Sequence, residues 1–149
     1  MQQVEVRHSF NHSADTLWQL TGDFAGLQHW LPGITSCTVE GNGPRDQGGN
    51  AVRSVQLMDG SVTRESLESF DPANRHYRYA IVSAKGFDPA QTYIGTFHVI
   101  PTGDNRCDIH WQANFTLPAE LPADKVDKAC DKIRNMYAFF LQQLAARLG

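Results

Sequence analysis

The sequence lacks the features that mark several large classes of protein. No apolar run approaches the ~20 residues of a membrane-spanning helix, and residues 1–5 have neither the basic nor the apolar segment of a signal peptide. The net charge is −3 and no basic cluster is present, which argues against nucleic-acid binding. We therefore expect a cytoplasmic protein with no membrane insertion and no nucleic-acid partner.

Motifs for metals, nucleotides and nucleophilic catalysis are also missing. Cys37, Cys107 and Cys130 are far apart and form no CxxC pair or Cys/His cluster, so reduced, partly buried thiols are expected. The glycine-rich stretch 41–49 lacks the Lys-Ser/Thr ending of a phosphate-binding loop. The six histidines are scattered, and only His29 is a weak candidate for a general base. We expect no metal and no cofactor.

The clearest positive signal lies at residues 120–149, where apolar side chains recur at three- and four-residue steps. This spacing places them on one side of a helix. At 1.5 Å per residue the helix would be roughly 40 Å long, about the width of a small domain. The apolar positions are Val126, Cys130, Ile133, Met136, Tyr137, Phe140, Leu141 and Leu144.

The rest of the chain alternates between apolar and polar residues, which predicts strands with one dry face. The expected strands are 3–11, 35–40, 50–58, 61–70, 75–84, 91–101 and 106–117. Two short helices should follow the first strand: one from the N-cap Ser13 to about Thr21, and one bracketed by Gly22 and Gly33. The order predicts an α+β fold: one domain, 1–149, with a curved seven-stranded antiparallel sheet wrapped around the long C-terminal helix.

The hairpin around Asp59-Gly60 leaves two registers open. A two-residue turn would place Leu57 opposite Val62, and Glu65 would then lie on the opposite face from Leu57. A three-residue loop, Asp59 to Ser61, would place Val55 opposite Glu65. A slip of one residue moves every side chain to the other face, and we adopt the three-residue loop.

Three segments resemble the START-like (Bet v 1-like, SRPBCC) superfamily of helix-grip proteins, and most of all its bacterial polyketide cyclase/dehydrase-type branch. These are 13–18 with Gly22-Asp23-Phe24, 30–33 through Ser36-Cys37, and 48–53 running to 65–68. The resemblance covers essentially the whole chain. It implies a cavity between the sheet and the long helix that binds apolar or amphipathic small molecules. Since members include enzymes, carriers and receptors, the fold does not supply the reaction.

The expected site combines aromatic walls with a few polar groups. Arg53 shares its strand face with Val55 and Leu57, and the resemblance implies that Arg53, Glu65, Tyr93 and Thr35 face or adjoin the pocket. The alternative is that Arg53 and Glu65 form an ordinary pair on the wet face. The predicted ligand-binding residues are Thr35, Arg53, Val55, Leu57, Glu65, Leu67, Tyr79, Ile81, Tyr93, Phe97, Trp111, Phe115, Ile133, Met136, Tyr137 and Phe140.

Three functions remain open. The first is binding of a small hydrophobic or amphipathic molecule, such as a polyketide, an aromatic or a lipid-like compound. The second is an enzyme of the cyclase or dehydratase type, with Arg53, Glu65 and Tyr93 as candidate catalytic residues. The third is a filled helix-grip domain that serves a partner protein. We also expect loops 58–62 and 84–90 to cover the entrance, and a monomer or homodimer.

Overall fold

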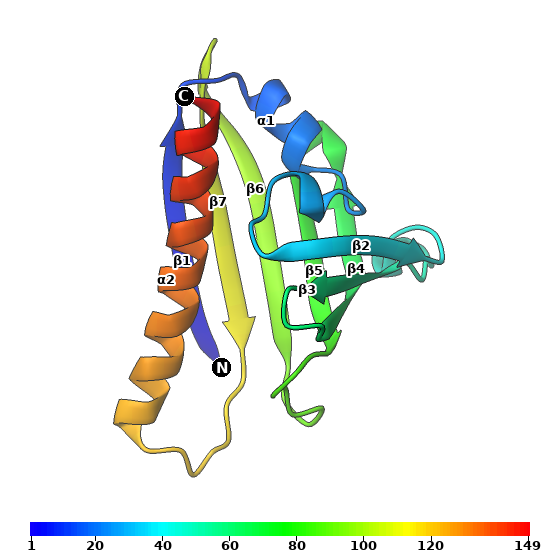
Figure 1. Ribbon diagram of the computed structural model, residues 1–149, viewed down its shortest axis with the longest axis vertical. Helices are drawn as coiled ribbons and strands as arrows, with labels where there is room; N and C mark the ends of the chain where they lie inside the picture. Colours follow the sequence, from blue (N-terminus) through cyan, green and yellow to red (C-terminus); the bar gives the residue numbers. More distant parts are fainter.

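The computed structural model describes residues 1–149 and shows one curved antiparallel sheet with a long helix packed along one side (Figure 1). The seven strands lie in the order β1-β7-β6-β5-β4-β3-β2. This confirms the predicted α+β helix-grip fold. The strands are β1 (Gln2–Phe10), β2 (Ile34–Glu40), β3 (Val52–Leu57), β4 (Val62–Asp71), β5 (His76–Ser83), β6 (Tyr93–Gly103) and β7 (Arg106–Phe115). Neither α-helix has the long apolar stretch that crossing a membrane would require.

Two helices follow β1 in the sequence-based prediction, and the structure has one α-helix and one short turn of 3-10 helix. Helix α1 (Ala14–Thr21) begins at Ser13, whose Oγ accepts a hydrogen bond of 3.1 Å from the Thr16 backbone N–H. The second segment is the single turn Leu27–His29.

The C-terminal helix α2 spans Ala123–Leu148, so it begins three residues later than predicted. Pro122 is its N-cap and has an extended backbone. Since the residue before a proline disfavours helical angles, residues 120–121 stay outside the helix. The buried side of α2 carries Tyr137, Leu141 and Leu144 and faces the sheet.

The β3–β4 hairpin has a three-residue loop, as adopted, but the loop lies one residue earlier than predicted. It consists of residues 58–60, so Val55 pairs with Thr63 and Arg53 pairs with Glu65. Gly60 has φ +85°, the left-handed conformation that closes a three-residue hairpin loop, and glycine adopts it without strain. Each residue of β3 pairs with a β4 residue two positions earlier than predicted. Because side chains alternate between the two faces of a strand, Arg53 and Glu65 keep their predicted faces.

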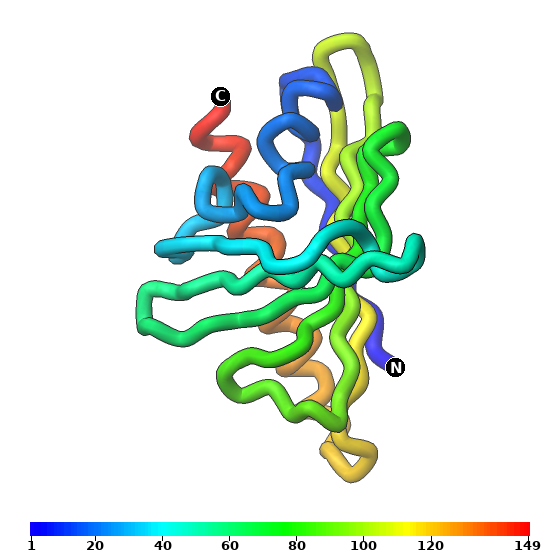
Figure 2. The backbone as a smooth tube through the Cα atoms, turned by 90° about the vertical axis from the view of Figure 1, so that its right-hand side faces the viewer, coloured from blue at the N-terminus to red at the C-terminus, as the bar shows by residue number.

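The sheet curls strongly, and this curvature creates room beneath α2. Register shifts interrupt β2 between Ile34 and Ser36, and β4 at Arg64/Glu65 and Leu67/Ser69. Such bulges bend a strand and increase its twist. Figure 2 shows β2, β3 and β4 turning away from the plane of β1 and β7. The sheet therefore closes around the inner side of the helix without lying flat against it.

Candidate functional site

A pocket of about 290 Å³ lies between the inner face of the sheet and α2, and we call it the central pocket. Fourteen of its eighteen lining residues are hydrophobic. Twelve of the predicted ligand-binding residues line it: Arg53, Val55, Leu57, Glu65, Tyr79, Ile81, Tyr93, Trp111, Ile133, Met136, Tyr137 and Phe140. The other six lining residues are Leu27, Leu31, Pro32, Ile34, Thr63 and Ala84.

Four residues predicted to bind ligand lie outside the central pocket. The hydroxyl of Thr35 donates to the Gln56 carbonyl on the exposed side of β2, at the bulge. Leu67 and Phe97 are buried in the core, and Phe97 packs edge-on against Trp111. Phe115 stacks on Tyr93 and lines a neighbouring surface pocket with it.

The lining residues that were not predicted come mainly from the segment 27–34. A tertiary contact holds this segment in place: the guanidinium of Arg147 on α2 donates to the His29 carbonyl at 2.8 Å. Nothing in the local sequence signals a contact over such a separation. Thr63 could have been found, because it shares its strand face with Glu65. The His29 side chain is exposed and does not line the pocket, which gives no support to its predicted role as a base.

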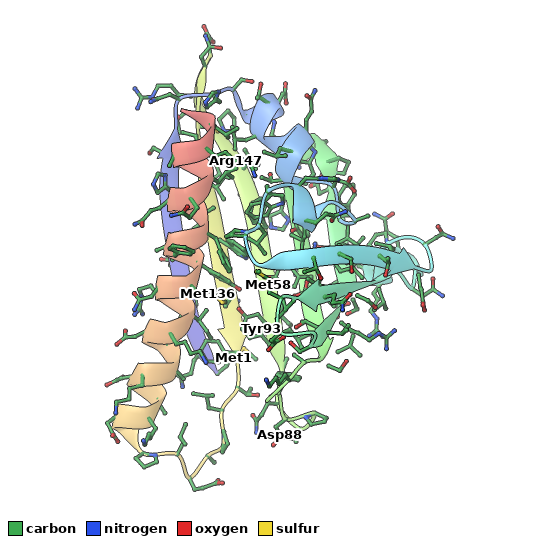
Figure 3. All side chains as sticks on the ribbon, in the orientation of Figure 1. Met1, Met58, Asp88, Tyr93, Met136 and Arg147 are labelled. Atoms are coloured by element: carbon green, nitrogen blue, oxygen red, sulfur yellow. The ribbon has the colours of Figure 1, made fainter.

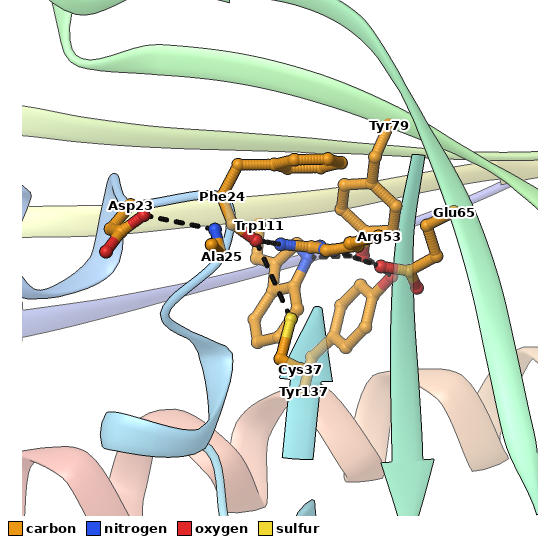
Figure 4. Close-up of polar contacts among 9 residues, drawn as sticks. All are labelled: Asp23, Phe24, Ala25, Cys37, Arg53, Glu65, Tyr79, Trp111 and Tyr137. Carbon is orange, nitrogen blue, oxygen red and sulfur yellow. Dashed lines mark hydrogen bonds and ion pairs between the residues drawn. The ribbon is translucent and has the colours of Figure 1, made fainter. Parts of the chain in front are cut away.

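Arg53 and Glu65 form a salt bridge at one side of the central pocket (Figure 4). The Nε atom of Arg53 donates to Oε1 of Glu65 at 2.7 Å, and its Nη1 donates to the Phe24 carbonyl at 3.2 Å. The guanidinium also lies over the rings of Phe24 and Tyr79, at 4.4 and 5.1 Å from their centroids. Only 2% of the Arg53 side chain is exposed. The pair is therefore buried, paired and hydrogen-bonded, as a buried charge requires.

The surroundings keep Arg53 charged. Burial alone would lower its pKa, but the adjacent Glu65 carboxylate and the nearby Tyr77 and Tyr79 hydroxyls together outweigh this effect and raise the pKa above its usual value. Its Nε and Nη1 atoms donate to Glu65 and to the Phe24 carbonyl, so Arg53 ties β4 to the segment that follows α1. Only the Oε1 atom of Glu65 accepts a hydrogen bond from Arg53. The second carboxylate oxygen has no protein partner, and Glu65 lines the central pocket.

A second polar group consists of three tyrosines and a tryptophan, and we call it the tyrosine chain. Trp111 Nε1 donates to the Tyr79 hydroxyl at 3.1 Å, which lies 3.2 Å from the Tyr137 hydroxyl. Tyr137 in turn is hydrogen-bonded to the hydroxyl of Tyr93. These residues come from β7, β5, α2 and β6, so the chain joins three strands to the helix. Burial raises the pKa of Tyr79, Tyr93 and Tyr137, which keeps their phenols protonated.

Close packing of the aromatic rings holds the hydroxyls of the tyrosine chain in position. The rings of Trp111 and Tyr137 stack with centroids 4.0 Å apart and planes 8° apart. Tyr79 crosses β6 directly over its partner Gly95, where an added Cβ would come within 2.1 Å of the Tyr79 ring. Only glycine permits this approach, so Gly95 allows Tyr79 to reach the helix.

The two loops expected to cover an entrance contact each other. Lys85 Nζ lies 3.4 Å from Asp59 Oδ2, and both side chains are exposed. Figure 3 labels Met58 on the first loop, Met136 on α2 and Tyr93 on β6. Met58 is 79% exposed. Among the large hydrophobic residues that line the central pocket, Met136 has the most exposed side chain. A covering role for these loops stays a prediction.

The structure contains no group of three or more His, Cys, Asp or Glu side chains arranged to hold a metal ion. The three cysteines are free thiols. Burial raises the pKa of Cys107 to about 11 and also raises the pKa of Cys37, which disfavours the reactive thiolate.

Comparison with known proteins gives one family and several solved structures. The family model described as polyketide cyclase / dehydrase and lipid transport matches residues 1–149. XoxI from Bacillus cereus is 30% identical, with a TM-score of 0.80 over 99% of this chain and 95% of that one. The di-domain ARO/CYC BexL is 16% identical, with a TM-score of 0.78 over 99% of this chain and 46% of that one.

Norcoclaurine synthase from Thalictrum flavum, in complex with dopamine and hydroxybenzaldehyde, is 18% identical, with a TM-score of 0.60 over 92% of this chain and 86% of that one. At such identities BexL and norcoclaurine synthase share the fold alone. A search of curated proteins gives no match.

Proposed function

Because the chain belongs to the polyketide cyclase / dehydrase and lipid transport family, we propose that it binds a small hydrophobic or amphipathic molecule between its sheet and α2. The ligand would be a polyketide, an aromatic or a lipid-like compound. The observation that carries the proposal is the central pocket, which is mostly apolar and has a few polar groups at fixed positions. This combination is typical of small-molecule sites.

The size of the pocket bounds the ligand. A cavity of ~150 Å³ accepts benzene, and drug-sized ligands occupy ~300–1,000 Å³. A pocket of about 290 Å³ therefore suits a compound with one or two rings or a short chain. Burying ~200 Å² of such a ligand at ~25 cal/mol per Å² contributes about 5 kcal/mol before the cost of association. Binding from apolar burial alone would be weak, so the polar groups would decide which compounds bind well.

Two polar groups are placed to orient a ligand. The free oxygen of Glu65 on β4 can accept a hydrogen bond, and Tyr93 brings a hydroxyl to the same pocket from β6, two strands along the sheet. Since Glu65 is balanced by the buried Arg53, the pair adds no net charge to the pocket. A neutral ligand with a hydroxyl or amine group fits these features better than an anion.

Binding is tested by native mass spectrometry of freshly purified protein, followed by thermal-shift measurements with a panel of one- and two-ring aromatic compounds. Ile133→Trp would fill the pocket from α2, whereas Lys132→Trp puts the same ring on the neighbouring exposed position. We expect a ligand-induced rise in Tm in the wild type and in Lys132→Trp, and its loss in Ile133→Trp. If no compound raises Tm, or if Ile133→Trp responds like the wild type, the central pocket is not the binding site.

A second candidate function is a cyclase or dehydratase reaction in the same pocket. It is favoured by the presence of a carboxylate, Glu65, and a phenol, Tyr93, in one apolar pocket, where each could move a proton. BexL, which has the same fold, is an ARO/CYC protein of a biosynthetic pathway. The test is Glu65→Gln, whose amide oxygen can still accept from Arg53. Turnover that is lost while ligand binding persists would favour an enzyme, and binding without turnover would favour a carrier or sensor.

Location and assembly belong to this proposal as well. We expect a single-domain cytoplasmic protein that is a monomer or a homodimer. Light scattering coupled to size-exclusion chromatography measures the mass in solution directly, and a mass above that of two chains would contradict the expectation.

A further inference from the structure

The hydrogen-bond directions in the tyrosine chain follow from counting its protons. The indole N–H of Trp111 can only donate, so the Tyr79 oxygen accepts from it. The three hydroxyls of Tyr79, Tyr137 and Tyr93 have three protons but only two links between them. One hydroxyl proton must therefore point outside the chain.

Burial decides which proton is left over. If Tyr79 donates to Tyr137 and Tyr137 donates to Tyr93, the free proton belongs to Tyr93, which is half-buried and lines the central pocket. In any other arrangement the free proton belongs to Tyr79 or Tyr137. All three tyrosines line the central pocket, but the side chains of Tyr79 and Tyr137 are only 4% and 1% exposed, and neither hydroxyl has a further protein acceptor. Leaving a buried donor unsatisfied is unfavourable, so the chain runs in one direction, from Trp111 to Tyr93.

We propose that this one-way chain holds the Tyr93 hydroxyl as a hydrogen-bond donor into the central pocket, and that the pocket selects ligands with an acceptor oxygen, such as a ketone, at that point. The inference deepens the proposed binding function and rests on it. Successive hydrogen bonds polarise one another, so Tyr93 would donate more strongly here than an isolated phenol. Tyr79 and Tyr137 are then positioning residues, and Tyr93 is the residue that touches the ligand.

Gly95 supports the proposal independently of the hydrogen-bond geometry. Tyr79 reaches Tyr137 only because the strand beneath its ring has no side chain. A glycine in the middle of a strand weakens it. Its presence opposite Tyr79 indicates that this ring must cross β6, as the tyrosine chain requires.

The test compares two probes of equal shape: benzophenone, and the hydrocarbon in which a =CH₂ group replaces the carbonyl oxygen. Calorimetry gives the ratio of their affinities, and the infrared carbonyl band of bound benzophenone reports hydrogen bonding directly. In the wild type we expect the ketone to bind about three- to tenfold more tightly, the range that one net hydrogen bond provides, with its carbonyl band moved to lower frequency.

Three variants separate the roles. In Tyr93→Phe we expect equal binding of both probes and loss of the infrared shift. In Tyr137→Phe, which keeps the ring stacked on Trp111, we expect a smaller ketone preference and a smaller infrared shift. Tyr77→Phe is the matched control: it removes another buried phenol that takes no part in the chain, and it should retain both effects.

The outcomes distinguish this inference from the function it rests on. If the wild type binds both probes equally, or if Tyr93→Phe keeps the ketone preference, the donor proposal is overturned while the binding function stands. If neither probe binds although a compound of the aromatic panel does, the donor proposal is overturned; if no compound of the panel binds either, both are overturned. The infrared measurement also controls for misfolding, because a variant that does not fold binds no ketone and gives no band of bound ketone.

Discussion

Arg53 on β3 and Glu65 on β4 lie directly opposite each other, and their side chains meet at 2.7 Å beside the central pocket. Arg7 and Asp108 form a salt bridge at the same distance on the outer side of the sheet, but there the arginine side chain is 53% exposed. The two pairs therefore share one N–O distance, but only the first has a buried arginine. Comparing them shows how burial changes the contribution of an ion pair to the free energy of unfolding.

We predict that Glu65→Ala lowers the free energy of unfolding by about 3–5 kcal/mol, because it leaves a buried guanidinium without its counter-charge. Asp108→Ala, which breaks the pair with the exposed Arg7 and one hydrogen bond from Ser9, should cost about 1–2 kcal/mol. Urea denaturation measures both. A double replacement, Arg53→Met with Glu65→Leu, should regain most of the loss, since it removes the buried charge entirely. Equal costs for Glu65→Ala and Asp108→Ala would contradict the burial argument.

Much of this fold could be predicted from periodicity. Strand β7 alternates between buried and half-exposed residues along its length, as its sequence indicates, and the three- and four-residue spacing near the C-terminus corresponds to α2. The predicted strand faces placed Arg53 and Glu65 on the same side. These properties are local, because each depends only on the spacing of residues within one element.

The remaining features of the site depend on contacts between distant parts of the chain. The hydroxyls of Tyr79 and Tyr137 meet across 58 positions of sequence, and no pattern within β5 or α2 indicates their pairing. The bulge beside Thr35 turns its side chain outward, which alternation alone does not reveal. The predicted position of the β3–β4 loop was wrong by one residue. The sequence Asp59-Gly60 is compatible with a loop at 58–60 and with one at 59–61, and only the pairing of the two strands decides between them.

Gly95→Ala should destabilise the protein through steric overlap. Its Cβ would lie 2.1–2.4 Å from atoms of the Tyr79 ring, so the ring must move away from Tyr137 and Trp111. We expect a loss of about 1–3 kcal/mol, typical of overpacking, and a change in near-ultraviolet circular dichroism. Gly103→Ala on the same strand is the control, because its Cβ would have no neighbour closer than 3.7 Å. If both variants unfold at the wild-type urea concentration, the close approach is not essential.

All four tyrosines should resist ionisation in the folded protein. Burial raises the pKa of Tyr77, Tyr79, Tyr93 and Tyr137 above the usual value of 10.0. Because the folded state then holds these protons more tightly than the unfolded state, their contribution to stability is complete below about pH 10 and declines as the pH rises further. Ultraviolet absorbance of tyrosinate should appear together with the loss of helical circular dichroism. Gradual ionisation near pH 10 in a protein that keeps its fold would show that the tyrosines are solvated.

Three histidines form a row across the outer face of the sheet, where His98 pairs with both His76 and His110. Partial burial and the neighbouring His98 lower the pKa of His76, and burial also lowers that of His98. Since the unfolded state binds these protons more tightly, the free energy of unfolding should fall as the pH drops below ~6.5. NMR titration of the imidazole signals checks the individual residues. In His98→Asn, which removes a neighbouring charge and opens the surface, the pKa of His76 should rise toward its usual value and the acid-induced loss of stability should shrink; an unchanged His76 would mean that its own desolvation, rather than the row, sets its pKa.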